Sequence, residues 1–192
     1  MTSWWWVRHG PTHEKAFVGW RDVPADLSDV AQIARLNAHL PDDALLVSSD
    51  LSRAKATADA IGGNRSRLPH TRAIRELNSG DWDGMEFEDV AARDPELSRE
   101  FWENPGDIIA PNGESWNMLA RRIAPFVDDM NARHPDRHIV AVAHLGVIMT
   151  QIELAGNISA YQAIGHSIDN LSVTRMDWDG SGWQLGVVNY LP

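Results

Sequence analysis

The sequence predicts an α/β fold, a three-layer α/β/α sandwich built around a mostly parallel central sheet. Short apolar runs with the character of buried strands alternate with stretches whose apolar residues recur at helical spacing. Polar residues follow directly after three of these runs, as they do at the carboxyl ends of parallel strands. The length of 192 residues suffices for a sizeable core, and we expect one domain over residues 1–192.

The first half of the chain predicts strands and helices in strict alternation. The apolar run Trp4-Trp5-Trp6-Val7 forms the first strand, and Ser28 is a suitable cap for the first helix. Glycines and prolines mark the ends of several segments. The predicted elements are, in order, a strand over 3–8, a helix from Ser28 to Pro41, a strand over 44–47, an alanine-rich helix between Ser48 and Gly63, and a short strand within 67–74.

The second half begins with a segment rich in glycine and proline, residues 78–112, which we expect to form short helices and loops as a lid. Glu114 or Ser115 then opens a longer amphipathic helix that contains Pro125. An apolar strand, a helix and a hairpin around Asp179-Gly180 complete the chain. Their predicted ranges are 138–143, 147–154, 171–178 and 183–188.

The composition limits the classes of partner. Lys and Arg total 17 and Asp and Glu total 27, which gives a formal net charge of −10. This charge disfavours nucleic acid and anionic membrane surfaces as partners. The chain contains no cysteine, no stretch approaches the ~20 apolar residues of a membrane helix, and we recognise no secretory leader. We therefore expect a cytoplasmic protein.

The polar residues after the three apolar runs carry the chemistry. Arg8 and His9 follow the first run, Arg53 the second, and His144 the third. Because such strand ends share one edge of a parallel sheet, we expect these side chains to converge into a pocket for a phosphate dianion. Taken alone, Arg53 also fits the role of a surface ion-pair partner, and His144 that of a buried core histidine. Glu76, an acidic residue between these motifs, alone fits a solvated carboxylate.

Five short motifs occur together and in a fixed order. They are Arg8-His9-Gly10-Pro11-Thr12, Ser49-Asp50-Leu51-Ser52-Arg53-Ala54, the segment from Glu76 to Gly84, Gly113-Glu114-Ser115, and Ala143-His144. Over nearly the whole chain this set resembles the histidine phosphatase superfamily, in the branch of the phosphoglycerate mutases. The chain resembles the small phosphatases of that branch, such as α-ribazole phosphatase, more than the mutases.

The resemblance implies a role for each motif residue. His9 is implied to be the nucleophile that becomes a phosphohistidine, and Glu76 the general acid for the leaving group. Arg8, Arg53 and His144 are implied to bind the phosphoryl oxygens. Further residues are implied to contact or shape the substrate pocket, and these are Thr12, Gly10, Gly19, Trp20 and Leu145.

Some positions depart from the family pattern. Pro11 replaces a common Glu or Gln, and Lys15 stands where an asparagine is frequent. His13 and His166 are further candidates for contact with substrate. The long insertion of the dimeric mutases has no counterpart between Gly84 and Gly113, which favours a phosphatase.

The sequence therefore predicts an acid-type histidine phosphatase, a metal-independent phosphomonoester hydrolase that acts through phosphohistidine on a small phosphorylated metabolite. We expect no metal and no cofactor, because no histidine or carboxylate spacing typical of a metal site is present. Two alternatives stay open: a phosphoglycerate mutase-type phosphoryl transfer, and a catalytically silent phosphate-binding module. Homodimer formation is also left open.

Overall fold

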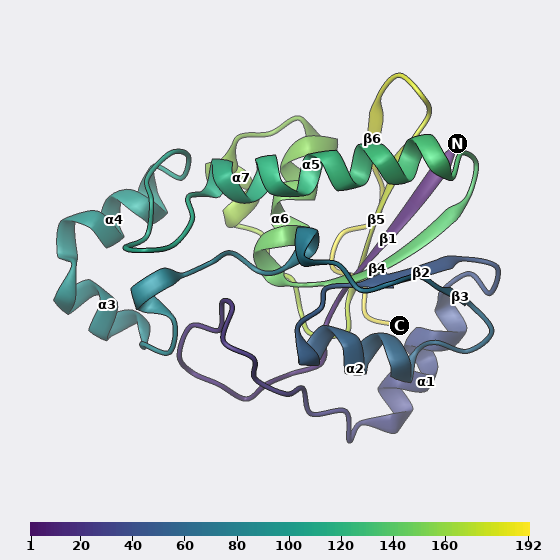
Figure 1. Ribbon diagram of the computed structural model, residues 1–192, viewed down its shortest axis with the longest axis horizontal. Coiled ribbons are helices and arrows are strands. Elements are labelled where there is room, and N and C mark those ends of the chain that lie inside the picture. The colour runs from purple at the N-terminus through teal and green to yellow at the C-terminus, as the bar shows by residue number, and fades with distance from the viewer.

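The computed structural model describes residues 1–192 and has a six-stranded sheet at its centre (Figure 1). The strand order is β3-β2-β4-β1-β5-β6. The first four of these strands run parallel, whereas β5 pairs antiparallel with β1, and β6 antiparallel with β5. The predicted mostly parallel sheet is confirmed. The strands are β1 Thr2–Arg8, β2 Leu45–Ser48, β3 Ser66–Arg67, β4 His138–Ala143, β5 Val173–Trp178 and β6 Trp183–Leu185.

Helices cover both faces of the sheet, which confirms the three-layer architecture. Two helices pack on one face and three on the other (Figure 1), and each face has its own cluster of buried apolar side chains. The helices of the first face are α1 Val30–His39 and α2 Ser52–Ala60. Those of the second face are α5 Trp116–Arg133, α6 Leu145–Gly156 and α7 Ala160–Ile164. The helix α5 continues through Pro125 without a break.

The tryptophan run of β1 shows why this segment is a central strand. Successive side chains of a strand point to opposite faces. Trp4 and Trp6 are fully buried on the α5 side, where their rings stack with centroids 5.0 Å apart. Trp5 lies on the other face, where it makes edge contacts with the rings of His39 and His138. Two buried indoles on one face anchor the strand between the two layers.

The helix starts differ in detail from the sequence prediction. The cap of α1 is Asp29 and not Ser28, because the Asp29 carboxylate accepts the backbone N–H of Gln32 at 3.0 Å. No side chain of its own segment caps α2. The carboxylate of Asp22, from the loop before α1, instead accepts the backbone N–H of Ser52 at 2.7 Å. This bond ties the loop to the start of α2.

The short strand expected within residues 67–74 is brief and begins one residue earlier. Ser66–Arg67 pairs with β2, Thr71 forms an isolated bridge with Ser49, and a 3-10 helix occupies Arg72–Ile74. The side chain of Thr71 accepts the backbone N–H of Ala73, so the chain turns at this point rather than extending.

The glycine- and proline-rich segment contains a 3-10 helix at Gly80–Trp82 and two short helices, α3 Phe87–Arg93 and α4 Pro95–Glu103. The two helices lie at one end of the molecule, beyond the carboxyl ends of the strands rather than over a face of the sheet (Figure 1). They pack in a small cluster of their own around Trp82 and Phe101. The segment therefore walls the end of the sheet where the predicted site lies.

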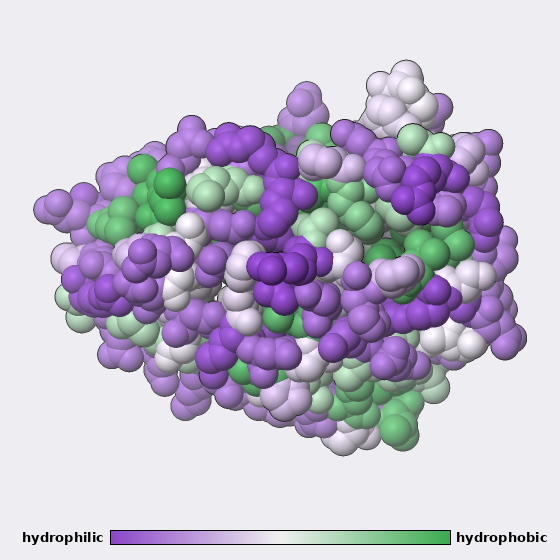
Figure 2. Space-filling model, in the orientation of Figure 1, coloured by the Kyte–Doolittle hydropathy of each residue, from purple (hydrophilic) through white to green (hydrophobic).

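The visible face of the molecule is mostly hydrophilic, with separate apolar patches between the polar residues (Figure 2). No helix has both the length and the apolar character needed to cross a membrane.

Candidate active site

The carboxyl ends of three parallel strands meet at one edge of the sheet. Arg8 of β1 lies opposite Ala143 of β4 in the register, and Ser48 of β2 lies opposite Val142. The residues that follow β1, β2 and β4 therefore enter the same region, as the sequence predicts. The rest of the site is built on this edge.

His9 leaves β1 with its ring fixed by a backbone carbonyl. The Nδ1 atom lies 2.7 Å from the carbonyl oxygen of Gly10, and since a carbonyl only accepts, Nδ1 carries the proton. The lone pair of the neutral ring is then on Nε2. Burial, assisted by the positive charges of Arg53 and Arg8, lowers the pKa of His9 to about 3. His9 is therefore a neutral imidazole with a free nitrogen, as a nucleophile must be.

Arg53 is fully buried in the first turn of α2 and is not a surface residue. Its guanidinium donates to the carbonyls of Val18, Gly19 and Arg21 at 3.3, 2.7 and 3.0 Å, which holds the loop before α1. Its Nε is buried without a hydrogen-bond partner. Burial lowers the pKa of the guanidinium, but the nearby charge of Glu76 opposes this effect.

Arg8 is fixed in a similar way. Its Nη1 donates to the carbonyl of Ile168 at 2.5 Å, and its Nε is also buried without a partner. Each arginine thus uses part of its guanidinium for anchoring and keeps one donor without a partner, and the charges of both act on His9. Such rigid donors suit the equatorial oxygens of a phosphoryl group.

His144 follows β4 and is the residue that precedes the first turn of α6. Its side chain is fully buried, and neither ring nitrogen has a hydrogen-bond partner. The ring centroid lies 5.1 Å from that of His9. Burial, with the charges of its neighbours, lowers the pKa of His144 well below its usual range. A buried imidazole without partners is costly in a purely structural role, which favours a ligand-binding role for His144.

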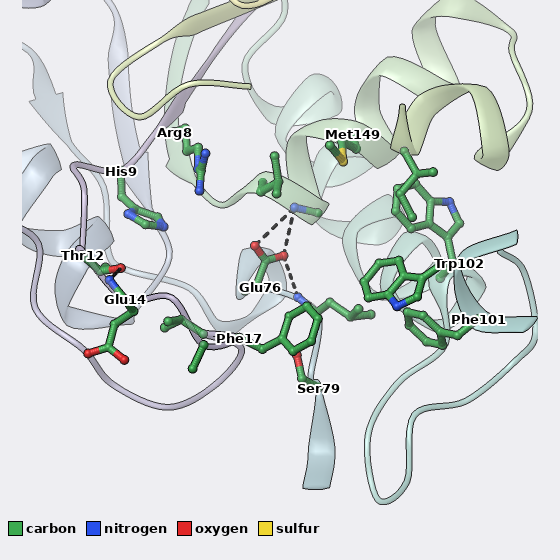
Figure 3. Close-up of a pocket in the computed structure, with 17 residues that line it drawn as sticks. Arg8, His9, Thr12, Glu14, Phe17, Glu76, Ser79, Phe101, Trp102 and Met149 are labelled. Atoms are coloured by element: carbon green, nitrogen blue, oxygen red, sulfur yellow. Dashed lines mark hydrogen bonds between the residues drawn. The ribbon is translucent and has the colours of Figure 1, made fainter. Parts of the chain in front are cut away.

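Glu76 lies across the site from His9 (Figure 3). Its carboxylate accepts the backbone N–H groups of Leu77 at 2.8 Å and Gly146 at 3.0 Å. Burial raises the pKa of Glu76, whereas these donors and the arginines Arg53 and Arg8 act in the opposite direction. A carboxyl group with a raised pKa is suited to hold and deliver a proton. Glu76 is therefore not a solvated carboxylate.

The backbone of Glu76 is held by two residues. Its carbonyl accepts the Nε1–H of Trp20 at 2.8 Å and the Nη2–H of Arg122 at 3.1 Å. Arg122 in turn forms two bonds of 2.8 Å with the carboxylate of Glu114. Sequence reasoning missed Arg122, because Glu114 lies before the start of α5 and no helical spacing relates the two residues.

Gly10 and Gly19, predicted to contact substrate, lie in tightly packed surroundings. A Cβ on Gly10 would lie 2.6 Å from Leu27 Cδ2, and a Cβ on Gly19 would lie 2.8 Å from the carbonyl oxygen of Leu77. The backbone N–H of Gly19 donates to Asp83 at 3.0 Å. Both glycines thus allow the loop after β1 to fold against the site.

A cavity of about 430 Å³ opens beside these groups (Figure 3). Five of the predicted site residues line it, namely Arg8, His9, Thr12, Glu76 and Leu145. The others do not line it, and these are Arg53, His144, Gly10, Gly19, Trp20, His13, Lys15 and His166. The sequence did not indicate Phe101 and Trp102, which form part of the wall.

His13 and Lys15 extend away from the cavity. His13 is exposed and its Nε2 contacts the Asp26 carboxylate at 2.7 Å, while Lys15 is exposed. Asp50 forms two bonds with Arg75, at 2.6 and 2.8 Å.

The arrangement of this site agrees with the comparison with known protein families. The family model of the histidine phosphatase superfamily (branch 1) matches residues 4–190. The chain belongs to the histidine phosphatase superfamily. The resemblance inferred from the five motifs is thereby confirmed over almost the full length of the chain.

Relatives within the superfamily include both phosphatases and a mutase-like protein. The glucosyl-3-phosphoglycerate phosphatase of Mycolicibacterium vanbaalenii is 34% identical over 95% of this chain and 92% of its own. Phosphoglycerate mutase-like protein 4 of Arabidopsis thaliana is 30% identical over 94% of this chain and 82% of its own. The native structure of a mycobacterial glucosyl-3-phosphoglycerate phosphatase superposes with a TM-score of 0.84, at 27% identity and 99% coverage of both chains.

Proposed function

We propose that this superfamily member is a metal-independent phosphomonoester hydrolase that acts through a phosphohistidine on a small phosphorylated metabolite. The observation that carries the proposal is the state of His9. Its Nδ1 is held by the Gly10 carbonyl, its ring is buried and neutral, and it lines the cavity beside Arg8 and Glu76. Phosphatase relatives over nearly the whole chain support the same reaction.

In the first step, Nε2 of His9 attacks phosphorus and the bond to the leaving oxygen breaks. In this step Arg8, Arg53 and His144 stabilise the charge on the equatorial oxygens. The carboxyl group of Glu76 gives its proton to the departing alkoxide, which leaves as an alcohol. The phosphoryl group is then bonded to His9, and Glu76 is ionised.

In the second step, a water molecule attacks the phosphohistidine. The Glu76 carboxylate takes a proton from this water, the N–P bond breaks, and inorganic phosphate and neutral His9 are regenerated. Glu76 thus serves first as acid and then as base. The arginines supply positive charge in both steps, so the proposal requires no metal ion.

A purified-enzyme assay tests the reaction type. We expect wild-type protein to hydrolyse p-nitrophenyl phosphate equally with and without a metal chelator, and to give an acid-labile, alkali-stable phosphoprotein on rapid quenching. His9→Ala should lose both signals, whereas His70→Ala, an exposed histidine outside the cavity, should keep them. Equal turnover by His9→Ala and wild type would refute the assignment of His9.

The same assay separates the two alternatives. A phosphoglycerate mutase would interconvert phosphoglycerate isomers in a reaction that depends on a bisphosphate primer. A silent module would bind inorganic phosphate, measured by calorimetry, but hydrolyse no ester. The cytoplasmic location, the absence of nucleic-acid and membrane partners, and dimer formation stay predictions of the sequence.

A further inference from the structure

The cavity has two ends of different chemistry. At one end lie Arg8 and His9, and Glu76 lies between them and the opposite wall (Figure 3). That opposite wall carries Phe101 and Trp102. If the phosphoryl group sits at His9 and the leaving oxygen meets Glu76, the organic half of the ester extends toward the aromatic wall.

The aromatic wall is preformed. Phe17, from the loop after β1, stacks on Trp102 of α4, with centroids 5.8 Å apart and an interplanar angle of 15°. Phe101 meets the Trp102 ring edge-on at 4.9 Å and 80°, and also contacts the buried Trp82 at 5.3 Å. Rings fixed in this way offer faces and edges on which another planar group packs well.

The remaining wall is apolar as well. Trp116, Leu145, Met149 and Ile164 come from α5, α6 and α7. Met149 lies across from the aromatic residues in Figure 3. A methionine opposite aromatic rings adapts to the outline of an apolar ligand.

The cavity offers no cation for a charged leaving group. Arg8 at the phosphoryl end is the only arginine or lysine that lines it, whereas Glu14 is an acidic residue of the lining. Arg21, on the same loop as Glu14, already forms ion pairs with the Glu14 carboxylate at 2.9 Å and with the Asp83 carboxylate at 3.6 Å. A carboxylate or a second phosphate on the leaving group would lose its hydration here without gaining a partner.

The volume suits a ring-bearing ester. An apolar cavity of about 150 Å³ holds one benzene molecule. The volume of about 430 Å³ therefore has room for a phosphoryl group together with a ring system.

We propose that the leaving group of the substrate is an uncharged apolar alcohol that carries a planar ring, bound between the Phe17–Trp102 pair and Met149. Esters with a carboxylate or a second phosphate on the leaving group are then poor substrates. This preference differs from that of the glucosyl-3-phosphoglycerate phosphatases, whose named substrate carries a carboxylate. The inference rests on the proposed phosphatase function.

The first test compares esters that differ only in the remote part of the leaving group. Benzyl phosphate and 4-carboxybenzyl phosphate have leaving alcohols of nearly the same acidity, and ethyl phosphate lacks the ring. We expect kcat/KM of wild-type protein to be about tenfold or more higher for benzyl phosphate than for either of the others. An equal or higher kcat/KM for the carboxylated ester would overturn the inference.

The second test changes the wall. Trp102→Ala should reduce the preference for benzyl over ethyl phosphate about tenfold. Phe87→Ala is the matched control, because Phe87 is 57% exposed, lies 6.4 Å from the Trp102 ring and does not line the cavity. An unchanged preference in Trp102→Ala, or an equal loss in the control, would contradict the inference.

A third variant does not depend on how Trp102→Ala folds. Ile164→Lys places a cation on the wall at a half-buried position where a lysine stem packs and its ammonium reaches water. We expect the ratio of kcat/KM for 4-carboxybenzyl over benzyl phosphate to rise about tenfold, and no rise would count against the inference.

The outcomes separate the inference from the function on which it rests. If wild-type protein hydrolyses none of the three esters, both the phosphatase function and the inference fail. If hydrolysis occurs and depends on His9 but shows no preference for the ring, only the inference fails.

Discussion

The carboxylate of Glu76 accepts the backbone N–H of Gly146 through both of its oxygens, at 3.0 and 3.2 Å. Gly146 lies in the first turn of α6, directly after His144 and Leu145, so the partial positive charge of the helix start is directed at the carboxylate. A Cβ at position 146 would lie 2.5 Å from the Oε1 of Glu76. The lack of a side chain at Gly146 thus lets the Glu76 carboxylate lie against the backbone that follows His144.

Gly146→Ala should displace the proposed acid without removing it. The added methyl overlaps the end of a side chain that can rotate, so we expect Glu76 to move rather than the backbone. Hydrolysis of benzyl phosphate should slow about tenfold or more, because its alkoxide leaves only with a proton. Hydrolysis of p-nitrophenyl phosphate should slow less, because p-nitrophenolate leaves without one.

The control for this prediction is Gly182→Ala. A Cβ there meets nothing within 4 Å, so this variant shows only the general effect of a Gly→Ala change. Equal slowing of both esters by Gly146→Ala would show that the change disturbs more than proton delivery.

Glu76→Gln should lower the activity of the protein and raise its stability. The variant keeps the shape of the side chain but cannot donate its proton in the same way, so kcat on benzyl phosphate should fall about 10²–10⁴-fold. Burial raises the pKa of Glu76. Wild-type activity on this ester should decline as the pH rises through this pKa, because the carboxyl group then loses the proton that it donates. Steady-state rates from pH 5 to 9 measure both effects.

The same pKa shift affects folding. Above the unfolded pKa of about 4.3, native Glu76 binds more protons than the unfolded chain, so its contribution to stability falls as the pH rises. At pH 8 the neutral amide side chain of the Glu76→Gln variant avoids a buried charge. We expect its Tm to be a few degrees higher, as about 1 kcal/mol shifts Tm by about 2–4 °C at this size. A lower Tm at pH 8 would argue against a destabilising ionised Glu76.

Much of the site followed from local sequence patterns. Arg8, His9 and His144 come directly after apolar runs, and the ends of parallel strands meet by geometry, so their convergence was predictable. Glu76 was identified only through the family resemblance, since no strand end positions it. Its raised pKa arises from burial by residues distant in the sequence.

The cavity wall was not predictable in the same way. Phe17 and Trp102 are 85 positions apart and meet only because α4 packs beyond the end of the sheet. Gly10 and Gly19 are predicted substrate contacts, and the structure adds that their lack of a side chain lets neighbouring segments pack closely. A short motif shows which residue types are present but does not show which surface each one contacts.

The ion pair between Arg122 and Glu114 should stabilise the fold around Glu76. Glu114→Gln removes the negative charge and one of the two acceptor oxygens that bond the half-buried guanidinium of Arg122, each at 2.8 Å. We expect the free energy of unfolding to fall by about 1.5–3 kcal/mol, measured by urea denaturation. Arg99→Gln, at an exposed pair with Glu103, is the control and should change stability by less than about 1 kcal/mol. A similar loss in both variants would contradict a special role for the buried pair.

The low pKa of His9 should appear as a pH-dependent stability. The folded pKa of about 3 is below the unfolded value of about 6.5, so between these values the unfolded chain binds the additional proton. The stability that neutral His9 contributes is therefore present above pH 6.5 and is lost as the pH falls toward 3. Between pH 7 and pH 5 this loss amounts to about 2 kcal/mol.

His9→Asn removes the titrating ring and should lose about 2 kcal/mol less stability than wild type between pH 7 and pH 5, measured by urea denaturation at both values. His70→Asn, at an exposed histidine, is the matched control and should keep the wild-type dependence. Nitrogen chemical shifts of the His9 ring at pH 5 give a second measurement, and we expect those of a neutral ring protonated at Nδ1. An imidazolium signal at pH 5 would contradict the neutral buried nucleophile on which the proposed first step depends.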